Sequence, residues 1–450
     1  MSVRTERGDW NRVAIAAVVL LVFAFIFGGA SRLHELRLAL VQLASLPLLV
    51  MTLNALAVPG AQRPSQLAGF ILLGVVLIPV LQLVPLPPAI WTALPGRQDA
   101  SLALELAGIR PGWAPLTLTP DKTWRSLLSL PPPAAIFLGV WLCRHSVRLR
   151  LVQGVVIFAA ASIAFGAAQV ASGASPLYLW PTTDAGSVTG FFANRNHLAT
   201  LVLISLPFAA VLAARGLRRD RPEERLTLWL AVLHIGLAIL ALGVIRSRTG
   251  ILLVPFVLIA SLLAAWIGAG RGRPKAAVLA IGGAATVAVV VVCLFALGPL
   301  MNRFEIGAGE GRFENWPLVL QAANNYLPTG SGLGSFDPVF RSVEPLERLD
   351  STFFNQAHND YLEILLETGW FGTGLLVAFL IWFSRRTWSA WRGGSSTEQD
   401  LKRAASIAIG VVLAHSAVDY PIRTLTIAVV FAMCCAILEV PRSNHRAGSE

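Results

Sequence analysis

One histidine stands where a polar segment gives way to a long apolar run. His358 is followed directly by Asn359 and Asp360, and the apolar run begins at Tyr361. If a helix begins here, the positive end of its dipole favours the neutral imidazole of His358 over the charged ring. A neutral imidazole can take a proton from a hydroxyl group, so His358 is a candidate general base. The alternative is an interfacial histidine that only hydrogen-bonds a loop carbonyl.

Acidic residues follow this histidine at helical spacing. Asp360 and Glu363 have the spacing of a helix capping box, and acidic side chains are favoured in the first turn of a helix. We therefore expect Asn359, Asp360 and Glu363 to support the start of the helix and to orient His358. A carboxylate base supplied by Asp360, Glu363 or Glu367 is the alternative.

Arginines recur in short polar segments rich in Gly, Asn and Ser. Those that could bind a phosphate group are Arg195, Arg246, Arg248 and Arg312. Arg246 and Arg248 separate two apolar runs with almost no loop, so both must lie near a membrane surface. Guanidinium groups bind phosphate oxygens through paired, charge-assisted hydrogen bonds. The set suits a lipid-linked diphosphate, whereas any one arginine alone is better explained as a head-group anchor or as the partner of an acidic residue.

The glycine-rich segment Gly330–Phe336 is only superficially like a phosphate-binding loop. It lacks the GxxxxGK[ST] pattern and does not follow a clear strand. We expect Gly332 and Gly334 to form a tight turn that allows close backbone packing, including packing against a substrate.

Residues that usually bind metals do not form a recognisable pattern. The sequence has neither an HExxH motif nor a cluster of Cys and His, and its four cysteines lie in or beside apolar runs. We expect no metal site and no cofactor.

The elements that must position these residues are strongly apolar. Of the 450 residues, 55% are hydrophobic and only 14% are charged, against roughly 25% charged residues in soluble domains, and the mean hydropathy is +0.66. These values exclude an ordinary soluble globule and predict an all-α polytopic membrane protein with about 12 transmembrane helices. The expected spans are Val13–Phe27, Leu36–Val58, Leu67–Leu86, Leu127–Cys143, Leu151–Ala171, Leu198–Ala214, Leu228–Ile245, Ile251–Ile267, Ala276–Leu297, Tyr361–Phe383, Ile407–Ala417 and Leu425–Leu438.

Basic residues are distributed unequally between the two sides of these spans. With the N-terminus inside, the inside segments hold 22 of the 36 basic residues but only 9 of the 25 acidic residues. Cytoplasmic loops are enriched in Lys and Arg, so both termini are expected in the cytoplasm. Two long loops, 87–126 and 299–357, then lie outside; the second, between the ninth and tenth helices, carries part of the site. This bias explains the net charge of +11 without nucleic acid, and residues 1–450 are expected to form one integral membrane domain.

Short helices are expected within these outer loops. They are an amphipathic helix at Ala100–Ile109 and a helix at Trp316–Tyr326, with Asn315 as its N-cap and Pro317 in its first turn. Asp419, at the outer edge of the eleventh run, is expected at the membrane interface.

Several of these segments together are typical of one membrane family. They are His358–Gly369 with Gly330–Phe336 upstream, Phe192–His197, Ser247–Gly250 and Arg312–Trp316. In this combination the chain resembles the O-antigen ligase and bacterial polysaccharide polymerase superfamily, which are membrane C-type glycosyltransferases.

The resemblance implies a metal-independent, inverting glycosyltransferase of lipopolysaccharide biosynthesis in the bacterial inner membrane, with its active site on the periplasmic face. Its donor is a glycan on undecaprenyl diphosphate. A ligase passes the glycan to lipid A-core, and a polymerase passes it to a second lipid-linked O-antigen or exopolysaccharide unit. By the same resemblance His358 acts as base or positions the acceptor, while Arg195, Arg248 and Arg312 hold the diphosphate and Arg246 can share that role.

A transporter or flippase for lipid-linked sugars is the alternative class. Such a protein should line a cavity through the membrane with basic residues, whereas the arginines singled out here are expected on one side. The partners expected in either class are lipid-linked glycans and membrane lipids.

Overall fold

The computed structural model describes residues 3–30, 35–173, 177–180, 186–218, 221–268, 311–348 and 354–441, together with 282, 283, 286 and 290. Its α-helices are α1 (Val3–Phe27), α2 (Glu35–Ala57), α3 (Gln66–Leu83), α4 (Pro88–Trp91), α5 (Gln98–Leu106), α6 (Pro120–Leu128), α7 (Pro131–Leu142), α8 (His145–Ala171), α9 (Arg195–Arg218), α10 (Pro222–Ile245), α11 (Arg248–Gly268), α13 (Gly311–Tyr326), α14 (Phe336–Val343), α15 (Asp360–Trp391), α16 (Thr397–Ser416) and α17 (Leu425–Glu439). Two 3-10 helices, η2 (Leu346–Arg348) and η3 (Pro421–Arg423), and an antiparallel pair of short strands, β1 (Pro85–Leu86) and β2 (Ala114–Pro115), complete the described elements.

Helices occupy the expected apolar runs along the described chain. Eight of them are long and apolar enough to cross a membrane, namely α2, α3, α6 with α7, α8, α9, α10, α11 and α15, and Asn11–Phe27 and α17 are shorter apolar helices. The eleventh expected run lies in α16, whose first turns carry Glu398, Asp400 and Lys402. The ninth expected run falls largely outside the described residues. The structure therefore supports an all-α polytopic membrane protein, and the number of twelve spans stays a prediction.

The centre of the bundle is α9. It packs against α8, α10, α11 and α16, and almost every side chain from His197 to Ala214 is buried. The outer helices instead expose large apolar side chains such as Ile157, Leu252 and Phe256. Apolar side chains on the outside are expected where the surrounding solvent is lipid, because the bilayer core offers no hydrogen bonds to polar groups.

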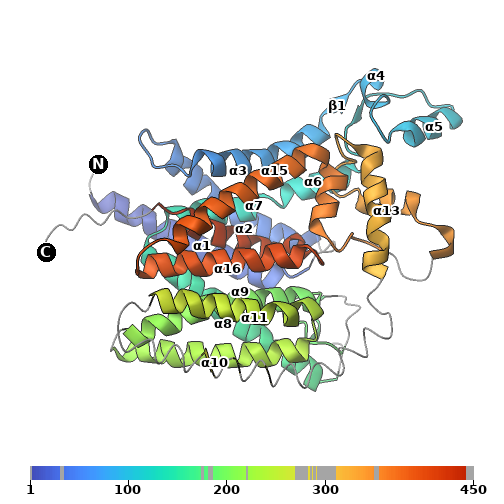
Figure 1. The fold of residues 1–450 in the computed structure, drawn as a ribbon. Coiled ribbons are helices and arrows are strands. Elements are labelled where there is room, and N and C mark those ends of the chain that lie inside the picture. Colours follow the sequence, from blue (N-terminus) through green and yellow to red (C-terminus); the bar gives the residue numbers. More distant parts are fainter. Residues whose placement is uncertain are drawn as a thin grey trace.

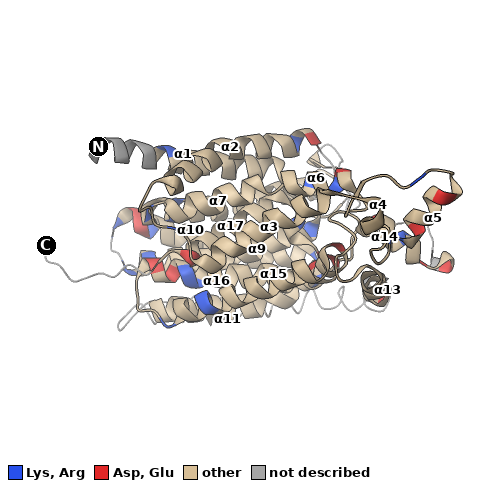
Figure 2. Cartoon of the chain, turned by 90° about the horizontal axis from the view of Figure 1, so that it is seen from above, with Lys and Arg blue, Asp and Glu red and all other residues tan. Residues whose placement is uncertain are grey.

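Charged residues gather at the two ends of the bundle and leave a long uncharged middle (Figure 2). At one of these ends lie α4, α5 and α13 (Figure 1). The start of α15 lies there too, because α13 packs against α15 and Nε1 of Trp316 donates a 3.2 Å hydrogen bond to the carbonyl of Ala357. We call this the site end of the molecule.

The first and last helices run in opposite directions. The start of α17 lies beside the end of α1, because Oγ1 and the amide of Thr426 donate hydrogen bonds to the carbonyls of Ala24 and Gly28 at 2.7 and 3.2 Å. The first residues of α1 and the last residues of α17 therefore share the end opposite the site end. This arrangement agrees with an even number of membrane crossings between them.

The outer loops contain more helix than expected. The helix expected from Trp316 begins at Gly311, so Asn315 is not its N-cap and Pro317 lies within it. Tertiary packing overrides the local cap signal here, because Val319 and its neighbours are buried in a small apolar cluster beneath this helix. Helix α14 was not expected, and it buries Phe336 and Phe340 in the same cluster. The amphipathic helix expected at Ala100–Ile109 is found as α5.

Candidate active site

His358 lies between two aromatic rings and beside a buried carboxylate. Its ring centroid is 4.9 Å from that of Tyr420 and 5.4 Å from that of Phe354, and its side chain is 14% exposed. Nδ1 lies 3.6 Å from Oδ1 of Asp419. This distance is too long for a direct hydrogen bond, but the carboxylate is close enough to stabilise a positive charge on the ring. His358 also has a φ of +49°, which is uncommon for a residue other than glycine, so the surrounding structure holds this backbone in place.

Asp419 connects His358 to the start of α9. Its Oδ2 accepts a 2.6 Å hydrogen bond from Nδ2 of Asn196, and its Oδ1 accepts one of 2.9 Å from the amide of Tyr420. Asn196 is itself fixed, because its amide donates a 2.8 Å hydrogen bond to Oδ1 of Asn194. Asp419, which was expected at the membrane interface, is buried within the protein and is 1% exposed. It can be buried because these donors replace the water that its carboxylate loses.

The start of α15 agrees with the expected place of His358 but not with the expected cap. Asn359 is the N-cap, and its Oδ1 accepts hydrogen bonds from the amides of Tyr361 and Leu362 at 3.0 and 3.2 Å. The capping box expected between Asp360 and Glu363 is therefore not formed, because the N-cap lies one residue earlier than expected. The carboxylate of Asp360 is instead used in tertiary contacts, and Oε2 of Glu363 accepts a 3.1 Å hydrogen bond from the amide of Ala357.

Three buried carboxylates of α15 surround one arginine of η3. Arg423 lies 2.8 Å from Oε1 of Glu363 and 3.5 Å from oxygens of both Asp360 and Glu367. Burial works against the charge of Arg423, but the three carboxylates hold the pKa of its guanidinium above the ordinary value. Oδ2 of Asp360 also accepts a 2.7 Å hydrogen bond from Oγ of Ser416. These contacts occupy the carboxylates that could otherwise compete with His358 as a base.

The glycine-rich turn packs against the protein itself. The amides of Gly334 and Phe336 donate hydrogen bonds to Oε1 of Glu367 at 2.9 and 3.2 Å, and the amide of Gly332 donates one of 2.9 Å to the carbonyl of Glu367. Gly332 and Gly334 have φ values of +107° and +85°. A Cβ on Gly334 would lie 2.5 Å from Cβ of Lys122, so this turn fills the space between α6 and α15.

Two of the candidate arginines begin helices next to one another. Arg195 is the first residue of α9, is half-buried, and donates a 3.3 Å hydrogen bond to Oγ of Ser187. Arg248 is the first residue of α11 and is also half-buried. The two helices approach closely here, because a Cβ on Gly250 would lie 3.0 Å from Cβ of Ala199.

The other two candidate arginines are placed differently. Arg246 is exposed and forms the C-cap of α10 with a φ of +55°. It lies in the tight turn that the sequence predicted between the seventh and eighth runs. Arg312 belongs to α13, but its side chain lies outside the described part of the structure.

Sequence reasoning missed the contribution of the segment 415–423. This segment supplies Asp419 to His358 and Arg423 to the carboxylates, and its His415 accepts or donates a 2.7 Å hydrogen bond with Oγ1 of Thr200 in α9. A weak signal was present, because this short connection between two apolar runs contains an Asp, a Tyr, a Pro and an Arg. Among the residues that the structure describes, no group of three His, Cys, Asp or Glu could hold a metal ion.

The fold and the site define a polytopic membrane protein whose polar groups of interest lie at one end of an apolar helix bundle. Residues 233–377, from α10 to the middle of α15, match the family model described as O-antigen ligase. The match includes Arg246, Arg248 and His358, and it confirms the resemblance of this part of the chain to the O-antigen ligase and polysaccharide polymerase superfamily. The family supports a ligase-type or polymerase-type activity on lipid-linked glycans. A comparison with curated proteins gave no match.

Proposed function

We propose that the protein is a glycosyltransferase of the O-antigen ligase type in the bacterial inner membrane. It transfers a glycan from undecaprenyl diphosphate to a hydroxyl group of lipid A-core at the periplasmic face. The observation that carries this proposal is the His358–Asp419 pair. The pair lies at the end of the bundle where α9 and α11 begin with Arg195 and Arg248.

His358 takes the proton of the acceptor in this proposal. Nδ1 faces Asp419, and we assign to Nε2 the acceptance of the proton from the attacking hydroxyl group. The ring then becomes positively charged, and the carboxylate of Asp419 stabilises that charge, as in other histidine–carboxylate pairs. The carboxylates of α15 are engaged by Arg423, which favours His358 over Asp360 or Glu363 as the base.

The leaving group is stabilised by the arginines. As the acceptor oxygen bonds to the anomeric carbon, the bond from that carbon to the diphosphate breaks and negative charge develops on the diphosphate. Guanidinium groups fixed near this position stabilise the transition state more than the ground state. Arg195, Arg248 and Arg312 are the candidates for this role, with Arg246 as a further one. Because the donor is already activated, neither a metal nor a cofactor is needed.

A single displacement of this kind inverts the configuration of the anomeric carbon. The proposed site fits one displacement because it offers one base for the acceptor and keeps the neighbouring carboxylates in ion pairs. A retaining enzyme with a covalent intermediate would need an accessible nucleophile.

The deciding experiment uses the purified protein with a labelled undecaprenyl-diphosphate glycan. Label that appears on lipid A-core only when lipid A-core is added supports the ligase. A ladder of longer lipid-linked glycans without lipid A-core would identify a polymerase instead. Movement of the label across a vesicle membrane without any transfer would identify a transporter or flippase and would refute the enzyme.

A further inference from the structure

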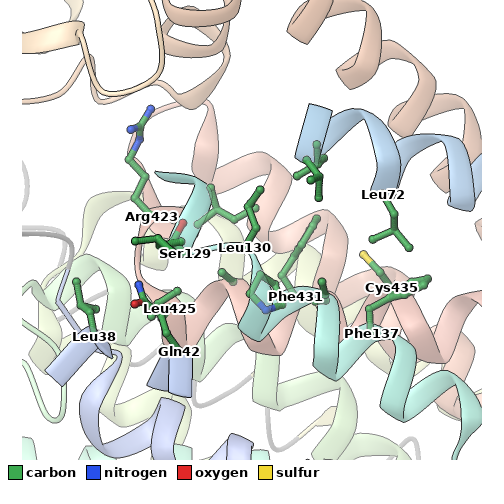
Figure 3. Close-up of a pocket in the computed structure, with 18 of the residues that line it drawn as sticks. Leu38, Gln42, Leu72, Ser129, Leu130, Phe137, Arg423, Leu425, Phe431 and Cys435 are labelled. Atoms are coloured by element: carbon green, nitrogen blue, oxygen red, sulfur yellow. The ribbon is translucent and has the colours of Figure 1, made fainter. Parts of the chain in front are cut away.

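An apolar groove of about 690 Å³ runs along the side of the bundle that α2, α3, α7, α15 and α17 form (Figure 3). Leu72, Phe137, Phe431, Trp382 and Cys435 are among the residues that line it. Its volume is within the range of sites that hold a small ligand or one end of a larger ligand.

The mouth of the groove at the site end is polar. It is lined by Glu35 of α2, Arg125 of α6 and Arg423 of η3. Arg423 is held by three buried carboxylates, whereas Arg125 makes a 2.9 Å ion pair with Glu35 in which the side chains are 42% and 73% exposed. Exposed ion pairs of this kind add little stability because water screens them. Arg125 can therefore exchange Glu35 for the phosphate of a lipid at little cost.

One short segment separates the groove from His358. Asp419 and Tyr420 contact the histidine, and Ile422 and Arg423 line the groove. Arg195 and Arg248 belong to the other side of the histidine, because α9 reaches it through Asn196 and Asp419 and α11 packs against α9. No residue of α9 or α11 lines the groove.

A transfer between two lipid-linked molecules needs two places where a hydrocarbon chain can lie while both head groups reach the same base. We infer, on the basis of the proposed function, that this groove holds the hydrocarbon chain of the acceptor lipid, with the phosphate next to that chain bound by Arg125. The donor lies on the α9 and α11 side, and His358 stands between the two.

Photocrosslinking tests the occupant directly and does not depend on activity. A benzophenone probe replaces Leu72 in the groove or, as a control, Ile157, which is 68% exposed on α8. The protein is held in phospholipid nanodiscs that contain a small fraction of lipid A-core or of undecaprenyl diphosphate. The Leu72 probe should enrich lipid A-core over its mole fraction by about tenfold, from the affinity of a charged hydrogen bond to phosphate. The Ile157 probe should reflect the bulk lipid composition.

Kinetics with matched variants test the polar mouth of the groove and its apolar wall. Arg125→Gln should raise the KM for lipid A-core by about tenfold and leave the KM for the donor unchanged. Glu35→Gln removes the competitor of the phosphate and should give an acceptor KM at or below the wild-type value. Ala428→Phe fills the groove from α17 and should also raise the acceptor KM, whereas Ala160→Phe makes the same change on α8 outside the groove and should not.

Each remaining outcome contradicts either the assignment of the groove or the proposed function. Bulk lipid composition at the Leu72 probe, or enrichment of undecaprenyl diphosphate there, overturns the assignment of the groove. An equal rise of the acceptor KM in Arg125→Gln and Glu35→Gln would show that only the ion pair matters, and it would also overturn the assignment. Enrichment of lipid A-core by a wild-type protein that transfers no glycan would leave the lipid site standing and refute the proposed function alone.

Discussion

His358 can serve as a base only if the charge that it gains is stabilised. The carboxylate of Asp419, 3.6 Å from Nδ1, is placed to do this, and the rings of Tyr420 and Phe354 fix the plane of the imidazole. The start of α15 alone would favour the neutral ring. The observed site combines both influences, so the histidine can begin neutral and still accept a proton.

Replacement of His358 by Ala should keep the fold and remove most transfer activity. Loss of a general base costs about 10²–10⁴ in rate, and His358 is not a member of the apolar clusters that form the core. Transfer of labelled glycan by the purified variant, with its melting temperature as a control for folding, measures this. Wild-type turnover in a folded variant would move the role of base to Asp360 or Glu363.

Replacement of Asp419 by Asn separates the charge of this residue from its place in the fold. The carbonyl oxygen of the new amide can still accept the hydrogen bond that Asn196 donates, and only the local bond from the amide of Tyr420 is lost. The variant should therefore fold and bind both substrates with nearly unchanged KM, while kcat falls by about tenfold or more, because the charge on the imidazole is no longer stabilised. An unchanged kcat would show that Asp419 only anchors α9.

Substitutions of Arg248 test whether guanidinium groups take the place of a metal ion at the diphosphate. Lys keeps the charge but not the planar pair of donors, so Arg248→Lys should lose at least about tenfold in kcat/KM, or roughly 1.4 kcal/mol of transition-state stabilisation. Arg248→Ala should lose more, and EDTA should have no effect on the wild-type enzyme. Full activity of Arg248→Lys, or activity that EDTA removes and magnesium restores, would contradict the arginine mechanism.

A tight backbone contact joins the glycine-rich turn to α15 at the site end. The turn at Gly330 packs against the first part of α15, which bends at Gly369, where φ is +58°. A Cβ on Gly330 would lie 2.6 Å from the carbonyl oxygen of Glu367. Because Glu367 also binds Arg423, a displacement of this turn would reach the carboxylate cluster.

The variant Gly330→Ala should therefore be less stable and less active. Its φ of +80° and the contact with α15 predict a loss of about 1–3 kcal/mol in the free energy of unfolding. Gly112→Ala is the matched control, because a Cβ there meets nothing within 4 Å and its φ lies outside the left-handed region. Thermal unfolding in detergent gives the comparison, and equal midpoints for the two variants would refute the importance of this contact.

The positions of the loops and of the last helix predict a single orientation of the protein in the membrane. The outer loops expected from the charge distribution contain α5 and α13, which lie at the site end, and the last residues of α17 lie at the opposite end. The basic residues expected inside then face the cytoplasm, and His358 faces the periplasm.

Cysteine labelling in intact cells with a permeabilised outer membrane tests this orientation. Ala107→Cys, exposed after α5, should react with a membrane-impermeant maleimide, and Gly394→Cys, exposed between α15 and α16, should react only after lysis. Cys143, Cys434 and Cys435 are buried, so the wild-type protein serves as the background measurement. The reverse pattern of labelling would place His358 in the cytoplasm and remove the basis of the proposed reaction.

Features that depend on the local pattern of residues could be predicted from the sequence. Long apolar runs require helices in a membrane, because only helices satisfy their own backbone hydrogen bonds there. The place of His358 just before α15 followed from the change between polar and apolar residues at Tyr361. The superfamily was also evident from short segments.

The packing of distant segments fixes which charged groups are buried together. Asp419 and Arg423 lie in a short connection that looks interfacial, and their burial depends on donors and acceptors from α9 and α15. A buried charge is stable only where such partners surround it. Those partners come from distant segments, and no spacing within the sequence reveals that the fold brings them to His358. The groove at Arg125 is decided in the same way, because its walls come from helices in both halves of the chain.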